Sequence, residues 1–402
     1  MKIVIGTHEY CGIVSGLQKG FEKLGHEVKS VIKKRGNYFN SKVYSIDLSN
    51  KSLGGKILHS FPIGGARIEQ FFQTRKYKSV FNHVLNSDFF VYIWDSLLPD
   101  LKDIIELKRQ GKKIFFLFIG SDVRFAPAFT QQFPEINIPW SDYYIKEDIN
   151  RKLFYIRTIE KYVDAIFSVP DQSGLQIRPF YHMHLPLDVD SILFHYPDNE
   201  IPEIVHVPSN RALKGTELII RAMEECKKRN LKFNFKIIEN QPNLVVKEEL
   251  QNTDIVIDQI YTNGPGMLGI EAMASGNALA TKFLESYNAF KPPVCYIDHT
   301  DILVSNMEKL IMDREYRREI AYNGRKFVEQ NNDIIKIAER MLSIYDGKVS
   351  ELDFYPTFFE KDFHLPEYQK LNKTSMQLNK EILSKCSASN HDFNSLSNRG
   401  LI

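Results

Sequence analysis

Residues 1–32 read MKIVIGTHEYCGIVSGLQKGFEKLGHEVKSVI, and their pattern is the clearest indication of the fold. The apolar run KIVIGT (2–7) is typical of a parallel strand that is buried on both faces. A turn with Gly12 follows, and residues 13–24 then carry apolar side chains at helical spacing. The run HEVKSVI (26–32) begins the next strand. A helix that joins two such strands predicts a βαβ unit and a parallel sheet.

Strand and helix patterns alternate along the rest of the chain in two blocks. The first block adds predicted strands at 88–94, 112–120 and 163–169 and a predicted helix at 99–109. The second block has predicted strands at 203–209, 233–239, 254–260 and 277–281, and helices at 216–228, from Met267 onward, and twice within 301–345. Thr216 is expected to cap the helix that it begins.

These blocks predict an α/β protein with two Rossmann-like, doubly wound domains that face a central cleft. We place the first domain at 1–190 and the second at 200–345, with a linker near Tyr196 to Pro202. A final helix is expected to cross back to the first domain. The extension at 346–402 is expected to be partly irregular, because its last thirty residues are polar and rich in Ser and Asn.

Composition excludes several classes of protein. The chain has 402 residues and a net charge of +2, so it lacks the strong positive charge of a nucleic-acid binder. No apolar run approaches the roughly 20 residues that span a bilayer, and the amino terminus does not resemble a signal peptide. The four cysteines are scattered, which favours a reducing compartment and argues against a disulfide framework or a zinc site. We therefore expect a soluble, cytoplasmic protein.

The predicted fold suggests the kind of ligand. In doubly wound sheets, ligands lie beyond the carboxyl ends of the strands, next to helix N-termini. The free backbone N–H groups and the dipole of such a helix favour phosphate. A phosphate-bearing ligand is therefore expected, although the fold alone does not name a reaction.

The segment NGPGMLGIEAMASGNALAT (263–281) carries the strongest motif. It resembles the donor-site motif of retaining GT-B glycosyltransferases, in particular glycosyltransferase family 4. That pattern is Glu, seven residues, Glu, then Ala-Met-Ala, a spacer and Gly. The resemblance implies that Glu271 hydrogen-bonds the ribose hydroxyls of a nucleotide. It also implies that the backbone of Gly266, Met267 and Leu268 contacts phosphate or sugar.

Asn263 departs from this pattern, because it stands where the family has its first Glu. In the family that Glu contacts the transferred sugar. Asparagine still hydrogen-bonds sugar hydroxyls, but it carries no charge to balance a developing oxocarbenium ion.

The segment VHVPSNRALKGTELIIRAM (205–223), followed by DIVIDQ (254–259), resembles a bacterial subgroup of the same superfamily. The resemblance implies that Arg211 and Lys214 clamp the diphosphate of the donor. The leaving nucleoside diphosphate gains negative charge as the glycosidic bond breaks, and fixed cations stabilise it. Such cations take the place of a metal ion. No cofactor or metal is therefore expected.

Three features of the first block are weaker candidates. The turn at Gly12 resembles the family's glycine loop, whose backbone N–H groups approach the donor phosphate or the acceptor. Asp122, at the end of a predicted strand, either binds acceptor hydroxyls, orients the sugar or caps a helix. His8 lies just past the first strand and either reaches the acceptor or is an ordinary loop histidine.

Phe71 and Phe72 precede the basic run Arg75 to Lys78. This segment either contacts an anionic membrane that holds a lipid-linked acceptor or forms a solvated helix face.

The resemblance implies a retaining, metal-independent glycosyltransferase (EC 2.4). Its donor would be a UDP- or GDP-sugar and its acceptor a glycan, a lipid-linked molecule or a protein, in bacterial-type glycan or glycoconjugate biosynthesis. Consistently, no carboxylate pair typical of a glycoside hydrolase is evident. One alternative is a catalytically silent GT-B partner subunit or nucleotide-sugar binder. It is motivated by Asn263 and by Ile119, which stands where the family often has a His. Another alternative is an epimerase, which no particular residue favours.

Overall fold

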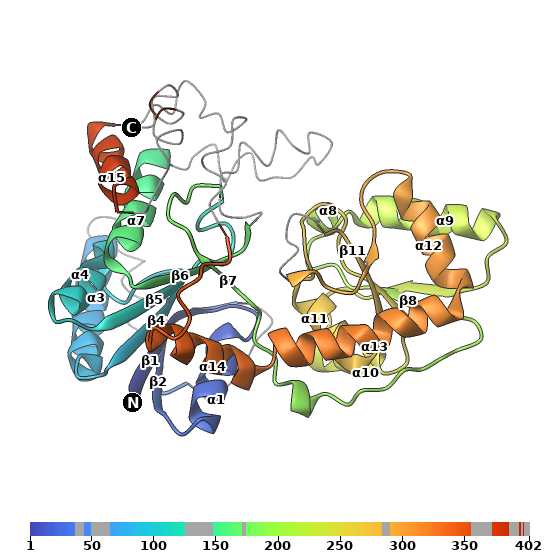
Figure 1. The fold of residues 1–402 in the computed structure, drawn as a ribbon, viewed down its shortest axis with the longest axis horizontal. Helices are drawn as coiled ribbons and strands as arrows, with labels where there is room; N and C mark the ends of the chain where they lie inside the picture. The colour runs from blue at the N-terminus through green and yellow to red at the C-terminus, as the bar shows by residue number, and fades with distance from the viewer. Residues whose placement is uncertain are drawn as a thin grey trace. The chain divides into compact units, whose positions relative to one another are not determined.

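The computed structural model describes residues 1–36, 44–49, 65–124, 148–170, 174–283, 290–354 and 372–385, together with 394 and 397. These residues form two compact units (Figure 1). The first unit contains the described residues up to 183 and those from 338 onward, and the second contains residues 184–337. The chain therefore returns to the first unit within helix α14 (Ile334–Tyr345).

The first unit contains a seven-stranded sheet in which every pair of neighbouring strands is parallel. Its strands are β1 (Lys2–Glu9), β2 (Glu27–Arg35), β3 (Ile46–Asp47), β4 (Phe89–Ile93), β5 (Lys113–Leu117), β6 (Ala165–Ser168) and β7 (Tyr181–His182). The order is β3-β2-β1-β4-β5-β6-β7, so the chain winds one way from β1 to β3 and the other way from β4 to β7. The central strands are apolar on both faces because helices cover both.

Neighbouring residues of β4 show the two covered faces. The ring of Phe89 lies 6.1 Å from that of Phe21 on α1 (Ile13–Lys23) and 4.9 Å from that of Tyr345 on α14. Phe90 points to the opposite face and belongs to the apolar cluster of the other helices. These helices are α3 (Gly65–Val84), α4 (Lys102–Arg109), which follows the 3-10 turn η1 (Pro99–Leu101), and α7 (Ile149–Tyr162).

Helix α15 (Lys373–Leu383) packs beside α7, as Figure 1 shows. Arg157 and Glu160 on α7 form an ion pair at 2.6 Å with both side chains fully buried. The Arg157 Nε donates to Asn379 of α15, and Ile382 enters the apolar core. The expectation of an irregular tail is therefore wrong for these eleven residues. The polar composition of this segment gave no indication of a helix, because α15 packs on α7 partly through buried polar side chains.

The second unit contains a five-stranded parallel sheet in the order β12-β11-β10-β8-β9. Its strands are β8 (Glu203–His206), β9 (Asn234–Ile237), β10 (Ile255–Ile257), β11 (Ala278–Thr281) and β12 (Cys295–Tyr296). Its helices are α8 (Arg211–Lys214), α9 (Thr216–Lys228), α10 (Asn243–Leu250), α11 (Met267–Ser275), α12 (Ile302–Met312) and α13 (Arg314–Asn331), and a 3-10 turn η3 (Val189–Ser191) precedes them. Each unit is thus doubly wound, as predicted.

The segment 301–345 forms three helices, whereas its pattern suggested two. Asp313 ends α12 in an extended conformation, and its side chain accepts a hydrogen bond from the Tyr316 N–H at the start of α13. Asp333 accepts from the Ile335 N–H at the start of α14. Aspartates at these two positions satisfy free N–H groups and so restart the helix. Among the helices that the structure describes, none is long and apolar enough to span a bilayer.

Candidate functional site

Lys214 and Asp258 form an ion pair at the carboxyl ends of β8 and β10 in the second unit. The Lys214 Nζ donates to Asp258 Oδ1 at 2.6 Å and to Gln259 Oε1 at 2.7 Å. The Asp258 side chain is fully buried, and that of Lys214 is 14% exposed. Because an ammonium has three N–H donors, one donor remains for a bound group after these two contacts.

The other oxygen of Asp258 holds the start of α11. The Gly266 N–H donates to Asp258 Oδ2 at 2.7 Å. A Cβ at Gly266 would lie 3.3 Å from the Lys214 Nζ, so the backbone passes close to the ammonium. The N-cap residue of α11 is Gly266, which brings no side chain, so within the described part of the chain the helix dipole and the N–H groups of Met267 and Leu268 are available for an anion.

This arrangement refines the predicted site. The structure brings together Lys214, Gly266 and the start of α11, and Asn263 lies in the turn that leads to them. The Gly266 N–H, however, is already bonded to Asp258, so Met267 and Leu268 are better placed to bind phosphate. Sequence reasoning noted Asp258 and Gln259 only as part of a motif. Their signal is a pair of polar residues immediately after an apolar strand.

Glu271 lies on α11, and its side chain is only 4% exposed. Its two carboxylate oxygens accept from Asn243 Nδ2 on α10 at 3.1 and 3.2 Å, and Lys247 Nζ lies 3.5 Å away. Burial raises the pKa of Glu271, although Lys247 and Asn243 oppose this shift. A carboxylate has about four acceptor positions, so further ones remain for hydroxyl groups.

Arg211 is an exposed residue of α8, and its partners differ from those of Lys214. Its guanidinium pairs with Glu217 at 2.8 Å and with Glu239 at 2.9 Å. The hydrogen bond to Glu217 is the main cause of its raised pKa. The role of Arg211 in a diphosphate clamp therefore stays a prediction, and it requires these surface pairs to open.

Gly215 links α8 to α9 with a φ of 74°. A Cβ there would lie 2.2 Å from Ile260 Cγ1, so both the conformation and the space require glycine. The N-cap of α9 is Gly215, and the Thr216 hydroxyl instead bonds His206 Nε2 at 2.9 Å. The prediction that Thr216 caps this helix is wrong, because the buried imidazole competes for its hydroxyl.

In the first unit, Glu9 occupies the position that the glycine loop was expected to offer to a phosphate. Its carboxylate accepts from the N–H groups of Val14 at 3.2 Å and Ser15 at 3.0 Å, and from the Tyr44 hydroxyl at 2.8 Å. Glu9 is fully buried, and burial raises its pKa. An internal anion thus faces the positive end of α1. A phosphate contact near Gly12 stays a prediction, without the help of these two N–H groups.

Asp122 closes a loop at the carboxyl end of β5. Its carboxylate accepts from the Gly120 N–H at 2.8 Å and the Ile119 N–H at 3.1 Å, and it caps no helix among the described residues. Lys152 holds the same loop through the carbonyl of Ser121 at 2.7 Å. Desolvation by the surrounding protein raises the pKa of Asp122 to about 6, although the residue keeps some contact with solvent. Its role toward an acceptor stays a prediction.

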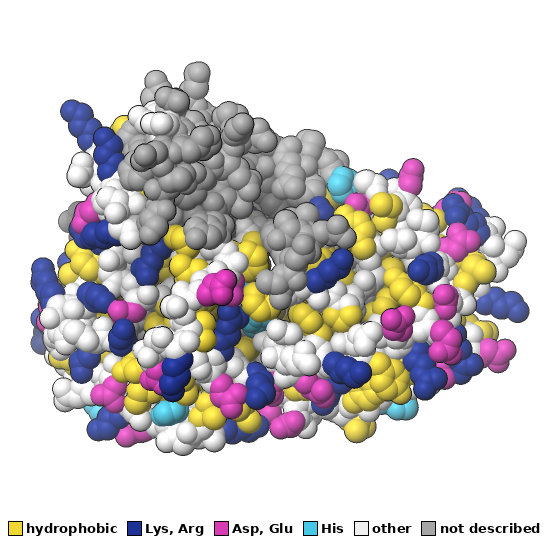
Figure 2. Space-filling view, in the orientation of Figure 1, with side chains coloured by type: hydrophobic (Ala, Val, Ile, Leu, Met, Phe, Trp, Pro, Cys, Tyr) yellow, Lys and Arg dark blue, Asp and Glu magenta, His cyan; other side chains and the backbone are white. Residues whose placement is uncertain are grey.

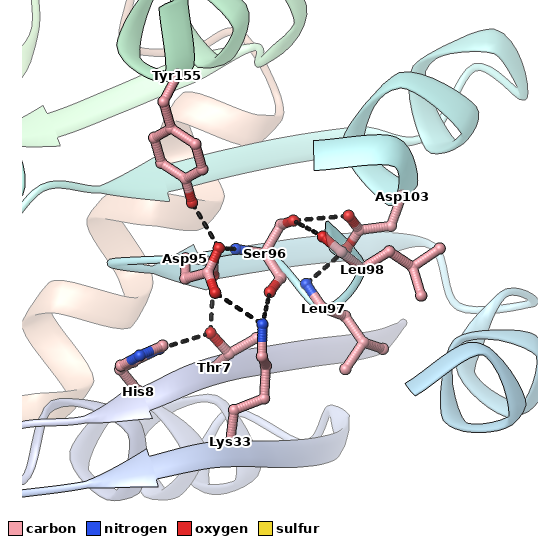
Figure 3. Close-up of polar contacts among 9 residues, drawn as sticks. All are labelled: Thr7, His8, Lys33, Asp95, Ser96, Leu97, Leu98, Asp103 and Tyr155. Carbon is pink, nitrogen blue, oxygen red and sulfur yellow. Dashed lines mark hydrogen bonds and ion pairs between the residues drawn. The ribbon is translucent and has the colours of Figure 1, made fainter. Parts of the chain in front are cut away.

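Asp95 is the centre of a polar cluster at the carboxyl ends of β1, β2 and β4, shown in Figure 3. It accepts from Lys33 Nζ at 2.7 Å, the Tyr155 hydroxyl at 2.6 Å and the Ser96 N–H at 2.8 Å. Thr7 Oγ1 donates to the Asp95 carbonyl oxygen at 2.8 Å. Asp95 and Lys33 were not among the residues predicted from the sequence. The signal that could have found them is the one that Asp258 shows, namely a charged residue at or near the end of an apolar strand.

Neither the scan against family models nor the search of curated proteins gives a match. Solved structures do match. A sucrose-phosphate synthase from Thermosynechococcus elongatus has a TM-score of 0.58 and 12% identity over 87% of this chain and 99% of its own. An alpha-glucosyltransferase in complex with UDP-glucose and DNA containing an abasic site has a TM-score of 0.59 and 12% identity over 86% and 99%.

A protein provisionally described as a UDP-N-acetylglucosamine 2-epimerase from Listeria monocytogenes has a TM-score of 0.50 and 14% identity over 87% and 97%. At such identities the likeness concerns the fold alone. The two parallel sheets with their helices and these structural matches confirm the predicted GT-B fold.

Proposed function

We propose that this protein is a retaining, metal-independent glycosyltransferase that moves a sugar from a nucleotide-sugar to an acceptor hydroxyl. The observation that carries the proposal is the contact of Lys214 with Asp258, beside the uncapped start of α11. One ammonium donor and a helix N-terminus converge there, which suits a phosphate group that gains charge. Glu271, one turn further along α11, would hold the ribose.

In the proposed reaction, the bond between the anomeric carbon and the diphosphate breaks while the acceptor oxygen approaches from the same face. The leaving diphosphate takes up the proton of the acceptor hydroxyl. Lys214 and the N–H groups of Met267 and Leu268 stabilise the diphosphate, and Asn263 hydrogen-bonds the sugar. Because protein cations and N–H groups supply this stabilisation, the reaction needs no divalent metal ion.

The donor is proposed to be a UDP- or GDP-sugar. The UDP option is supported by three alpha-glucosyltransferase structures of this fold that were solved with UDP or UDP-glucose. Some of those structures also contain DNA. For this chain a nucleic-acid acceptor is disfavoured. Its net charge is +2, and charges of both signs are interspersed over the described residues on the face drawn in Figure 2. A glycan, lipid-linked or protein acceptor in bacterial-type glycan biosynthesis remains the proposal.

A thermal-unfolding screen in buffer with EDTA tests the donor proposal. A ligand that binds the native state raises the melting temperature by mass action, about 2.7 kcal/mol of stabilisation at 100 times its Kd. We expect one nucleotide family among UDP, GDP, ADP and CMP, and its sugar conjugates, to shift the transition. A shift that appears only with added Mn²⁺ would contradict metal independence. No shift in folded protein would contradict the donor site.

A silent partner subunit is the second candidate, because Asn263 replaces a charged residue and Asp258 already compensates Lys214. The two candidates differ in turnover. A nucleotide-sugar that binds but is neither transferred nor slowly hydrolysed would favour the silent protein, and turnover would exclude it. An epimerase would instead convert the donor sugar without any acceptor.

We further propose a cytoplasmic location, which the scattered cysteines favour, with peripheral contact to an anionic membrane through α3. Phe71 and Phe72 are 58% and 60% exposed, and Arg75 and Lys76 follow one turn later on the same side of the helix. Exposed aromatic rings beside cations suit the interface of an anionic bilayer, where each cation adds about 1 kcal/mol.

Vesicle flotation tests this contact. Wild-type protein should float with vesicles that contain phosphatidylglycerol, and binding should fall with salt. The double substitution Phe71→Ser and Phe72→Ser should abolish flotation. Phe154→Ser on α7 is the matched control, because Phe154 is also exposed, at 48%. Equal flotation of all three proteins would refute the role of α3.

A further inference from the structure

The carboxyl ends of β1 and β4 have the topology of a binding site. These two strands are neighbours in the first sheet, and the direction of winding changes between them. Ligands of doubly wound proteins bind at such a switch point, outside the carboxyl ends of the strands. His8 is the second-last residue of β1, and Trp94 directly follows β4. His8 and Trp94 therefore both lie at the switch point.

Hydrogen bonding determines which nitrogen of His8 carries the proton. The Thr7 hydroxyl lies 2.8 Å from the Asp95 carbonyl oxygen, and a carbonyl can only accept. The single hydroxyl proton is therefore used there. Thr7 Oγ1 also lies 2.9 Å from His8 Nδ1, so in this contact the imidazole must donate. His8 consequently carries its proton on Nδ1, and Nε2 is left as a hydrogen-bond acceptor.

Aromatic rings hold the imidazole in place. The His8 ring stacks at 16° to Tyr10, with centroids 6.1 Å apart, and at 24° to Trp94, with centroids 6.3 Å apart. Tyr10 and Trp94 are partly exposed and lie 5.1 Å apart. Trp94 has a φ of 69°, a conformation that a bulky residue adopts only when its surroundings enforce it. The two rings offer apolar surface next to a polar acceptor atom.

Burial keeps the His8 side chain neutral. Burial, first of all, lowers its pKa to about 4, and Lys33 and Lys34 act in the same direction. Asp95 opposes them, but Lys33 pairs with its carboxylate. At neutral pH the ring therefore accepts a hydrogen bond without carrying charge. With so low a pKa it is a weak base, so it suits orientation of a hydroxyl rather than removal of its proton.

We propose that His8, Tyr10 and Trp94 at these strand ends bind a neutral sugar acceptor, whose hydroxyl donates to His8 Nε2 while its ring packs against Trp94 and Tyr10. Thr7 acts as a positioning residue, because its hydroxyl selects the tautomer. A neutral acceptor is favoured over a phosphorylated one, since the Glu9 carboxylate already occupies the start of α1. The inference rests on the proposed glycosyltransferase function and names its acceptor class.

Nitrogen NMR of protein labelled at histidine tests the tautomer. The His8 signals should show a protonated Nδ1 and an unprotonated Nε2 from pH 5 to 8 in wild type. Thr7→Val should yield a mixture of tautomers. Adding methyl glycosides of the common hexoses should move the Nε2 signal in wild type. A protonated Nε2, or no movement with any glycoside, would overturn the proposal.

Binding measurements with the same methyl glycosides test the residues. His8→Phe keeps an aromatic ring but lacks the acceptor atom, so the glycoside Kd should rise about 3- to 10-fold. Trp94→Ala should raise it by a similar factor. Both variants should keep the wild-type thermal shift with nucleotide. Unchanged glycoside binding beside a normal nucleotide shift refutes this inference alone. A wild type that shifts with no nucleotide refutes the proposed function instead.

Discussion

Lys214→Met is expected to lower kcat/KM for sugar transfer by about 10²- to 10³-fold. The ammonium donates to Asp258 and Gln259 and keeps one donor for the diphosphate, which becomes more negative as the sugar leaves. Methionine retains the length of the side chain but offers no charge and no donor. Initial rates with the nucleotide-sugar that the thermal screen identifies would measure the effect.

The same substitution leaves the fully buried Asp258 carboxylate without its cation. Removing one partner of a buried pair costs about 3–5 kcal/mol, so Lys214→Met alone should also unfold at lower temperature. The double variant Lys214→Met with Asp258→Asn removes both charges and should regain much of the lost stability. Transfer should stay impaired. Recovery of activity along with stability would show that Lys214 acts only through the fold.

Glu271→Gln is expected to weaken nucleotide binding about 10- to 100-fold, as loss of charged hydrogen bonds to the ribose hydroxyls predicts. Titration calorimetry with the nucleoside diphosphate measures this directly. A matched comparison is the 2′,3′-dideoxynucleotide, which should bind equally weakly to wild type and variant. A Kd that does not change on substitution would contradict the assignment of Glu271 to the ribose.

The raised pKa of Glu271 predicts two further effects. Nucleotide affinity of the wild type should fall as the pH is lowered, and at a higher pH than for an ordinary glutamate, because the ribose requires the ionised form. Glu271→Gln should abolish this pH dependence. The fold favours the protonated carboxyl, so ionisation costs stability above the raised pKa. The glutamine variant should therefore be at least as stable as wild type at pH 7. A large loss of stability would indicate a structural role.

Much of the architecture could be predicted from local patterns. The apolar runs that became β1, β4, β5 and β10 are short and continuous, which is typical of strands buried on both faces. The helix predicted at 216–228 has these same bounds in α9. These elements are predictable because burial of each one depends mainly on its own periodicity.

The elements that failed depend on distant partners. Helix α15 has a polar sequence, and it is held by Arg157, which donates to Asn379 from a position 222 residues earlier in the chain. Thr216 stands where a cap is expected, but buried His206 takes its hydroxyl. Composition and spacing carry no information on such contacts.

From its residues alone, the chain is predicted to form two parallel α/β units, which the structure confirms, and to carry a donor-type motif at 263–281, which stays a prediction. Periodicity and motif spacing are local properties, so a short stretch of sequence is enough to recognise them. Two sets of contacts become visible only in the folded chain: Asp258 joins Lys214 to the start of α11, and the Thr7 hydroxyl bonds the Asp95 carbonyl oxygen beside His8. They form because parallel strands far apart in the chain end at one edge of a sheet, where their side chains meet.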